Sequence, residues 1–145
     1  NEVLKIWTPD IIQIPFNVID QRFSEKSYLK KLKKKKIKIF CRSCFLQGIL
    51  LNNKSNVKFS RESKKIIKRF EKWCFINKIS KIDACINFIK QEKNIDFLVI
   101  GVNSLLQLDE ILKSFFSKKI IKITKKIKSN NLKLIDPRKW IYERS

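Results

Sequence analysis

A glycine and a serine separate an apolar segment from a helical pattern in the sequence IDFLVIGVNSLLQLDEI, residues 95–111. The β-branched stretch Phe97–Ile100 predicts a buried parallel strand, and Gly101 can adopt backbone angles that other residues disfavour. Ser104 has the position of a helix N-cap, with Gln107 completing an S-x-x-Q capping box. A helix N-terminus at the end of a strand offers N–H groups to a phosphate. Many such turns only connect two elements, so this segment alone is no more than a candidate phosphate site.

Four further polar side chains lie at or just beyond the ends of two predicted strands, and they are Gln13, Asn17, Ser43 and Gln47. The carboxyl ends of parallel strands meet at one edge of a sheet. That edge is the ligand side both in doubly wound sheets and in (β/α)8 barrels. We therefore expect these four residues on the ligand side of the fold.

The four cysteines are Cys41, Cys44, Cys74 and Cys85, and the first two form a C-x2-C pair that invites a zinc or redox interpretation. The other two are eleven residues apart on predicted helices, and the chain has no histidine. Cys41 also ends a predicted strand, whereas redox pairs open a helix. Buried, reduced thiols are therefore the better interpretation.

Three strand-then-helix units recur along the chain, and this alternation predicts an α/β fold with a parallel sheet. The predicted strands are Asp10–Phe16, Lys36–Cys41 and Phe97–Ile100. The predicted helices are Ser27–Lys35, Arg61–Lys78 with Ser60 as N-cap, Lys81–Gln91 with Ser80 as N-cap and Asp83 in an S-x-x-D box, and Leu105–Phe116. The architecture at this point is part of a doubly wound sheet or part of a (β/α)8 barrel.

The carboxyl-terminal third carries further expectations about packing. The periodicity of the last helix predicts that it buries Leu105, Leu108, Ile111, Leu112 and Phe115. An amphipathic segment is expected over Ile120–Lys128, Pro137 is expected to end regular structure, and Trp140 is expected to pack back on the body. No Gly/Ser-rich linker interrupts the chain, so one domain is expected over residues 1–145.

The segments DIIQIPFNVIDQRF, CRSCFLQGILL and IGVNSLLQLDEIL resemble, in order and spacing, the last three strand-helix units of the aldo/keto reductases. The resemblance extends to LIDPRKW near the end of the sequence. It implies that residues 1–145 are the C-terminal portion of a single TIM barrel, with three parallel strands alternating with helices plus a C-terminal helix and tail. It also implies that NADP or NAD binds across the strand ends and that hydride passes to an aldehyde or ketone.

Residue by residue, the resemblance implies a set of cofactor contacts. Gln13 would hydrogen-bond the nicotinamide carboxamide, because an amide donates and accepts at once. The loop residues Ser43, Phe45, Gln47 and Gly48 would wrap the pyrophosphate and ribose, and Gly101, Asn103, Gln107 and Glu110 would lie toward the adenine end. Other interpretations remain open: Gln13 as a solvated strand end, the loop as a turn that only needs glycine, Gln107 as a capping partner and Glu110 as an exposed helix charge.

Three positions depart from the family pattern. Arg42 stands where an aromatic ring often stacks on nicotinamide, although a guanidinium plane can also stack. Asn103 and Gln107 are neutral where a basic residue usually pairs with the 2′-phosphate, so the choice between NADP and NAD is open. Ile111 stands where an asparagine commonly follows the adenine-site glutamate.

The family's catalytic Asp, Tyr, Lys and His come from earlier strands of the barrel. This chain has no histidine, and its two tyrosines, Tyr28 and Tyr142, are expected on a helix and in the tail. We therefore assign no catalytic residue. The resemblance implies the cofactor-binding half of an oxidoreductase that is inactive alone, with its carbonyl substrate bound through a missing N-terminal half. The absence of methionine also predicts that the chain is a fragment or a processed piece.

Lysine and arginine number 34 against 13 acidic residues, a formal net charge of +21. Lysines occur in every segment and arginine is scarce, which favours a solvated surface and argues against nucleic acid as a partner. The alternatives are a non-catalytic lysine-rich module that binds nucleic acid or another anionic polymer, and a half-barrel interaction or regulatory subunit.

No apolar run of about 18 residues and no signal-peptide pattern is present, so we expect no membrane partner and a cytoplasmic location. The oligomeric state is not indicated.

Overall fold

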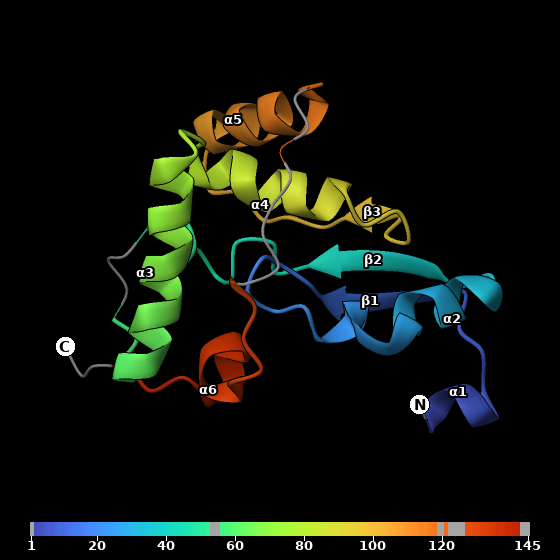
Figure 1. Ribbon diagram of the computed structural model, residues 1–145. Helices are drawn as coiled ribbons and strands as arrows, with labels where there is room; N and C mark the ends of the chain where they lie inside the picture. The colour runs from blue at the N-terminus through green and yellow to red at the C-terminus, as the bar shows by residue number, and fades with distance from the viewer. Residues whose placement is uncertain (1, 53–55, 119–120, 122–126, 143–145) are drawn as a thin grey trace.

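The computed structural model describes residues 2–52, 56–118, 121 and 127–142. Figure 1 shows a small sheet with helices around it. In chain order the elements are α1 (Val3–Ile6), β1 (Ile11–Pro15), the 3-10 helix η1 (Arg22–Ser27), α2 (Tyr28–Lys34), β2 (Lys38–Arg42), α3 (Arg61–Ile76), α4 (Lys81–Lys90), β3 (Phe97–Leu98), α5 (Leu105–Phe116), α6 (Leu132–Ile135) and the 3-10 helix η3 (Pro137–Lys139).

The three strands form a parallel sheet in the order β1-β2-β3. Gln13 pairs with Phe40, which pairs in turn with Phe97, and Pro15 pairs with Arg42. Strands alternate with helices as predicted, in an α/β fold consistent with part of a TIM barrel. The sheet is open, since neither outer edge has a partner strand among the described residues (Figure 1).

One face of the sheet is buried and the other is not. Ile14, Ile39 and Cys41 are almost fully buried, and the Phe16 ring just beyond β1 stacks on Phe88 of α4 with centroids 5.1 Å apart. The opposite face, which we call the bare face, carries side chains that are largely exposed, namely Ile11, Gln13, Lys38, Arg42 and Phe97. Strand side chains alternate between faces, so the register places these five together.

The predicted helix starts at Ser60, Ser80 and Ser104 are confirmed. Each hydroxyl oxygen accepts a hydrogen bond from the N–H three residues later, at 3.2, 3.0 and 3.2 Å respectively. The Gln107 side chain also reaches back, but it accepts from the N–H of Asn103 at 2.9 Å, one residue earlier than the capping box predicts. The three helix starts are therefore set by local sequence.

Strand β2 begins two residues later than predicted because the end of α2 occupies the intervening residues. Lys36 has a left-handed backbone with φ 60°, and the N–H of Ile37 donates to the carbonyl of Leu32 at 3.2 Å. This arrangement satisfies a carbonyl at the helix end before the chain extends.

Two packing predictions in the third unit are wrong for most of their residues, although Ile111 is buried as predicted. Strand β3 comprises two residues and is not buried, since half of Phe97 is exposed, because β3 lies at an open edge. In α5 the buried residues are Ile111 and Ser114, whereas Leu105 is 85% exposed. Leu112 and Phe115 are also exposed, because α5 lies on α4 as an outer layer, away from the sheet (Figure 1).

Gly101 does not use the left-handed backbone angles that its type permits, whereas Gly48 does, with φ 84°. Pro137 does not end regular structure, because it begins the short helix η3. The amphipathic segment predicted over residues 120–128 falls largely outside the described residues.

Two other predictions are confirmed. Trp140 is buried, its Nε1–H donates to the carbonyl of Leu134 at 3.0 Å, and its ring meets Phe59 edge-on at 5.5 Å. All four cysteines are buried and free.

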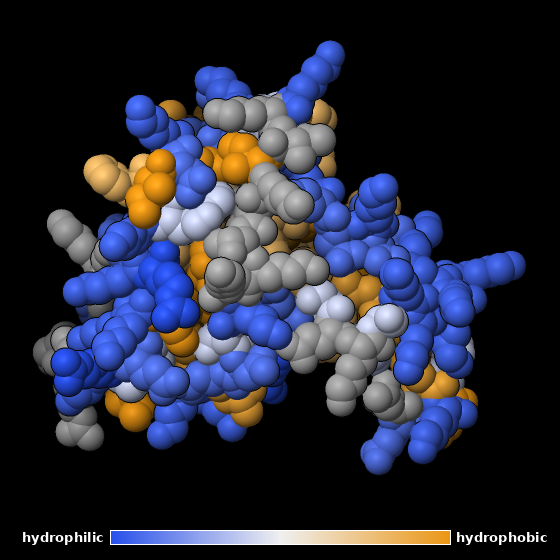
Figure 2. All heavy atoms as spheres, in the orientation of Figure 1, coloured by the Kyte–Doolittle hydropathy of each residue, from blue (hydrophilic) through white to orange (hydrophobic). Residues whose placement is uncertain are grey.

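No helix in the described part of the chain is long and apolar enough to cross a membrane. Figure 2 shows hydrophilic residues over most of the visible face, with apolar patches between them.

Candidate functional site

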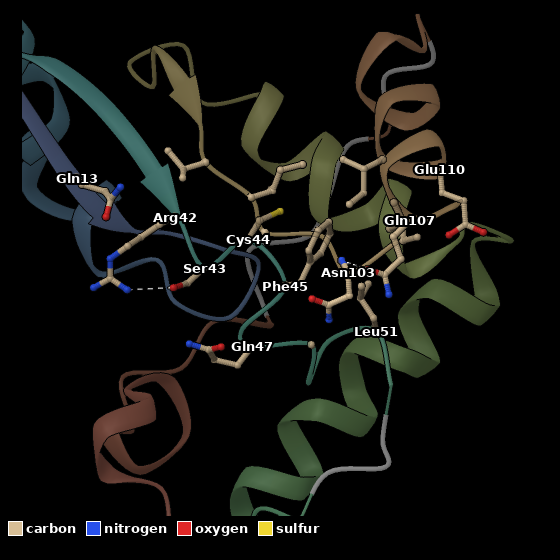
Figure 3. A pocket seen from close by; sticks show the side chains of 16 residues that line it. Gln13, Arg42, Ser43, Cys44, Phe45, Gln47, Leu51, Asn103, Gln107 and Glu110 are labelled. Carbon is tan, nitrogen blue, oxygen red and sulfur yellow. Dashed lines mark hydrogen bonds between the residues drawn. The ribbon is translucent and has the colours of Figure 1, made fainter. Parts of the chain in front are cut away.

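A cavity of about 850 Å³ lies at the carboxyl ends of the strands (Figure 3). All ten residues predicted to contact a cofactor line it: Gln13, Arg42, Ser43, Phe45, Gln47, Gly48, Gly101, Asn103, Gln107 and Glu110. They come from β1, from β2 and the loop after it, from the turn after β3, and from α5. Three sequence-distant segments therefore converge on one cavity.

The ends of β1 and β2 bring Gln13, Arg42 and Ser43 to one end of the cavity (Figure 3). Gln13 and Arg42 both project from the bare face, and Arg42 lies two residues beyond the Gln13–Phe40 pair toward the strand ends. The Arg42 Nη1–H donates to the Ser43 hydroxyl at 3.1 Å. An amide, a guanidinium and a hydroxyl are thus available side by side for hydrogen bonds.

Asn17 fixes the loop that carries Ser43, a role that the sequence did not reveal. Its side-chain oxygen accepts from the N–H groups of Ile19 and Asp20 at 2.9 and 2.8 Å, and its Nδ2–H donates to the carbonyl of Ser43 at 3.0 Å. Asn17 is 1% exposed, so these bonds are shielded from water. The loop after β1 therefore holds the loop after β2 in place.

The loop after β2 has an unusual backbone. Ser43, Leu46, Gln47 and Gly48 have φ values of 61°, 47°, 53° and 84°. Left-handed angles are uncommon for residues other than glycine and are found at ligand sites. Within the described residues, the N–H groups of Phe45, Gln47 and Gly48 donate no hydrogen bond to the protein. Successive N–H groups in such turns form a concave surface that binds anions.

The other end of the cavity is formed by the turn after β3 and the first turns of α5. Gln107 and Glu110 lie there, far from Gln13 in Figure 3. The side-chain Oε1 of Gln107 already accepts from the N–H of Asn103, so Gln107 lines the cavity and also helps to cap the helix. Glu110 is exposed.

Charge is sparse in the cavity despite the strongly basic chain. Among the described lining residues, Arg42 is the one cation and Glu110 the one anion, and they lie at opposite ends. The described lining near Gly101, Asn103 and Gln107 includes no basic side chain. Most of the +21 charge therefore lies elsewhere on the surface.

Cys44 lines the cavity but is 2% exposed. Burial raises the pKa of its thiol well above the ordinary value, and the neighbouring Cys85 and Cys41 raise it further. Burial also raises the pKa of Cys41 to about 12. Both thiols are therefore neutral, and Cys44 serves as part of the wall and not as a nucleophile.

The model of the aldo/keto reductase family matches residues 3–129. This chain belongs to the aldo/keto reductase family. The match includes all ten predicted cofactor residues, and the three parallel strands agree with it. None of the curated proteins matches the chain. Membership of this family supports the prediction that the parent protein is an oxidoreductase.

Six lining residues of this aldo/keto reductase chain were not predicted as part of the site: Cys44, Leu51, Ile82, Val99, Ile100 and Ile111. They form the apolar part of the wall. Their sequence signal is that of ordinary core residues, because an apolar side chain beside a cavity has the same type and periodicity as one in the core. Ile82 enters from α4, which carried no site prediction.

Proposed function

We propose that this chain is the cofactor-binding, C-terminal half of an NAD(P)H-dependent aldo/keto reductase that reduces aldehydes or ketones to alcohols. The observation that carries the proposal is the convergence of Gln13, the Ser43–Gly48 loop and the turn after β3 on one cavity. Polar groups from three strand ends of a parallel sheet are the usual setting of a nucleotide site.

The residues present fit a nicotinamide dinucleotide. The cavity volume lies within the range of roughly 300–1,000 Å³ common for ligand sites. Gln13 would hold the carboxamide, and the free N–H groups of Phe45, Gln47 and Gly48 would bind the pyrophosphate together with the Ser43 hydroxyl. The cofactor supplies the hydride; the residues of this chain bind and orient it.

The α5 end of the cavity would hold the adenosine. A 2′-phosphate gains most from a basic partner, and the described lining there includes none. Use of NADP is therefore not favoured over NAD by charge, and both belong in any assay.

The proton donor would come from outside this chain. Neither Tyr28 nor Tyr142 lines the cavity, and the chain has no histidine. Carbonyl reduction needs a positioned general acid as well as hydride. The 145-residue chain alone is therefore expected to be inactive, and its substrate-binding site would be completed by other strands of the barrel.

The test is turnover by the protein expressed from the whole open reading frame that encodes this chain. We expect oxidation of NADPH or NADH, followed by nicotinamide absorbance, with at least one member of an aldehyde panel. No oxidation above background by a folded protein that binds the cofactor would contradict the proposed reaction.

A further inference from the structure

We propose that the outer face of α3 binds the surface of a membrane leaflet rich in anionic lipids, with its lysine and arginine side chains at the headgroups and Phe75 and Ile76 inserted between them. The inference goes beyond the proposed function, because no residue of α3 lines the described cavity. The expectation of no membrane partner depends on the absence of a spanning segment, whereas a surface helix binds a leaflet without crossing it.

The cations of α3 lie opposite its buried residues. Ser63, Ile67, Phe70 and Cys74 form the buried inner face of the helix. At 3.6 residues per turn, the exposed cations of α3 all fall on the outer side, and we call them the basic stripe: Arg61, Lys64, Lys65, Lys68, Arg69 and Lys72. Hydrophilic side chains cover α3 in Figure 2, which keeps the orientation of Figure 1.

The sequence of α3 supplies little negative charge to offset the stripe. Residues 61–76 contain two acidic side chains, Glu62 and Glu71, against the six cations. Glu71 is directed to the neighbouring helix, where its Oε1 accepts from Lys81 Nζ of α4 at 2.7 Å. The outer face of α3 therefore presents a concentrated positive charge to an approaching surface.

Two large apolar side chains continue the same face at the end of α3. Phe75 and Ile76 follow Lys72 by three and four residues, which places both beyond it on the outer side of the helix. Phe75 is 84% exposed and Ile76 is 64% exposed. An apolar patch is visible at this end of α3 in Figure 2. Both side chains would leave water on entering the interface of a bilayer.

The composition of this face favours a lipid surface over a nucleic acid. Four of the six cations are lysines, and lysine attracts anionic headgroups as a point charge without a required geometry. Nucleic-acid surfaces rely on the forked donors of arginine and on several aromatic rings that stack on bases. Here Phe75 is accompanied by Ile76, which has no ring to stack, whereas a bilayer interface accommodates both residues.

The test is flotation of the protein from the whole open reading frame with vesicles of equimolar phosphatidylcholine and phosphatidylserine. We expect binding at low salt, none to phosphatidylcholine alone, and release at about 0.5 M salt. Binding should weaken at least tenfold in a variant with glutamine at three stripe positions, Lys65→Gln, Lys68→Gln and Lys72→Gln. The matched control removes the same charge from exposed positions on α2 and should change binding less than about threefold: Lys30→Gln, Lys31→Gln and Lys34→Gln.

The apolar pair distinguishes insertion from attraction by charge alone. The variant Phe75→Ser with Ile76→Ser keeps the stripe and should bind the same vesicles about tenfold more weakly. All variants alter exposed side chains and should keep the circular dichroism spectrum and thermal midpoint of the wild type. Equal losses in the α2 and α3 lysine variants would show that binding follows the overall charge, and would overturn the proposal.

A nucleic-acid role for this face has a different signature. If a single-stranded oligonucleotide releases the wild type from the vesicles, and Phe75→Ser with Ile76→Ser leaves vesicle binding unchanged, the stripe serves an anionic polymer and the proposal is wrong. A folded wild type that does not float with the anionic vesicles at low salt would also overturn it. Neither result bears on the cofactor site, because α3 contributes no described residue to the cavity.

Discussion

Arg42 and Cys44 are two residues apart and both line the cavity, but the Cys44 side chain is buried and the Arg42 side chain is exposed. Arg42 is exposed and keeps its charge available, whereas the Cys44 thiol is enclosed and neutral. Burial also raises the pKa of Cys74 to about 11. At this scale, residue type indicates what chemistry is possible and the surroundings decide whether it occurs.

We predict that all four cysteine thiols of the folded protein react slowly with Ellman's reagent at mildly alkaline pH. A pKa raised by two units lowers the thiolate fraction by about a hundredfold, so rates should fall by at least that factor relative to the unfolded chain. Cys74 should react first, because the pKa of its thiol is raised least. In denaturant all four should react at once; a thiol that reacts as fast in the folded protein would show that its burial is wrong.

Residue types also limited what the sequence could predict of the site. Gln13, Ser43 and Gly48 stand out as polar or glycine positions at strand ends, so a pattern of types finds them. Asn17 acts through bonds to the backbone of residues 19, 20 and 43, and the last of these bonds depends on two loops meeting in space. Such a contact has no counterpart in local spacing.

At the scale of the elements, the helix starts that depend on neighbouring residues were predicted correctly, whereas the burial of β3 and α5 was not. The three serine N-caps depend on residues within one turn, and they lie where the sequence indicates. The exposure of β3 and α5 depends on what covers them, which periodicity cannot show.

Asp96 shows how a loop residue secures a short strand. Its N–H donates to the carbonyl of Ile39 at 2.9 Å, and its carboxylate accepts from the N–H of Ile39 at 2.7 Å and from Lys33 Nζ at 2.6 Å. Both backbone groups of one β2 residue are therefore satisfied immediately before β3 begins. Although burial alone raises the pKa of Asp96, the hydrogen bonds from Lys33 and Ile39 outweigh it, and the pKa is lowered from 3.8.

We predict that Asp96→Ala lowers the free energy of unfolding by about 1–3 kcal/mol at neutral pH, because the buried N–H of Ile39 loses its acceptor. Lys33→Met removes only a partly exposed ion pair and should cost less than about 1 kcal/mol. Urea unfolding measures both.

Comparison of the wild type with Asp96→Ala also tests how the contribution of Asp96 to the free energy of unfolding depends on pH. Because folding lowers the pKa of Asp96, its contribution is present above 3.8 and is lost as the pH falls below that value. The stability gap between wild type and Asp96→Ala should therefore narrow in acid. A gap that stays constant or widens there would contradict the carboxylate's role.

At the scale of the whole molecule, the open sheet governs what the chain can do alone. Both outer strand edges lack a partner strand in the described residues, and Ile11 and Phe97 on the bare face are each about half exposed, at 52% and 50%. Unpaired edges and exposed apolar faces favour association with other strands. The cavity likewise lies at the margin of this open sheet.

We predict that the 145-residue chain alone binds NADPH and NADH weakly or undetectably, because both outer edges of its open sheet lack a partner strand among the described residues. Calorimetric titration of the isolated chain would measure this. Micromolar affinity would show that the described residues form a complete cofactor site without further strands.

The most direct test of the cofactor site is a calorimetric titration of NADPH and NADH into the protein from the whole open reading frame, compared with Gln13→Leu. Gln13 is exposed, so its loss should leave the fold intact, and Lys38→Met on the same bare face but outside the cavity is the matched control. We predict saturable binding to the wild type and to Lys38→Met, weakened about tenfold in Gln13→Leu through the lost amide hydrogen bonds. A folded wild type that binds neither cofactor, or a Gln13→Leu protein that binds as tightly as the wild type, would contradict the proposed cofactor site.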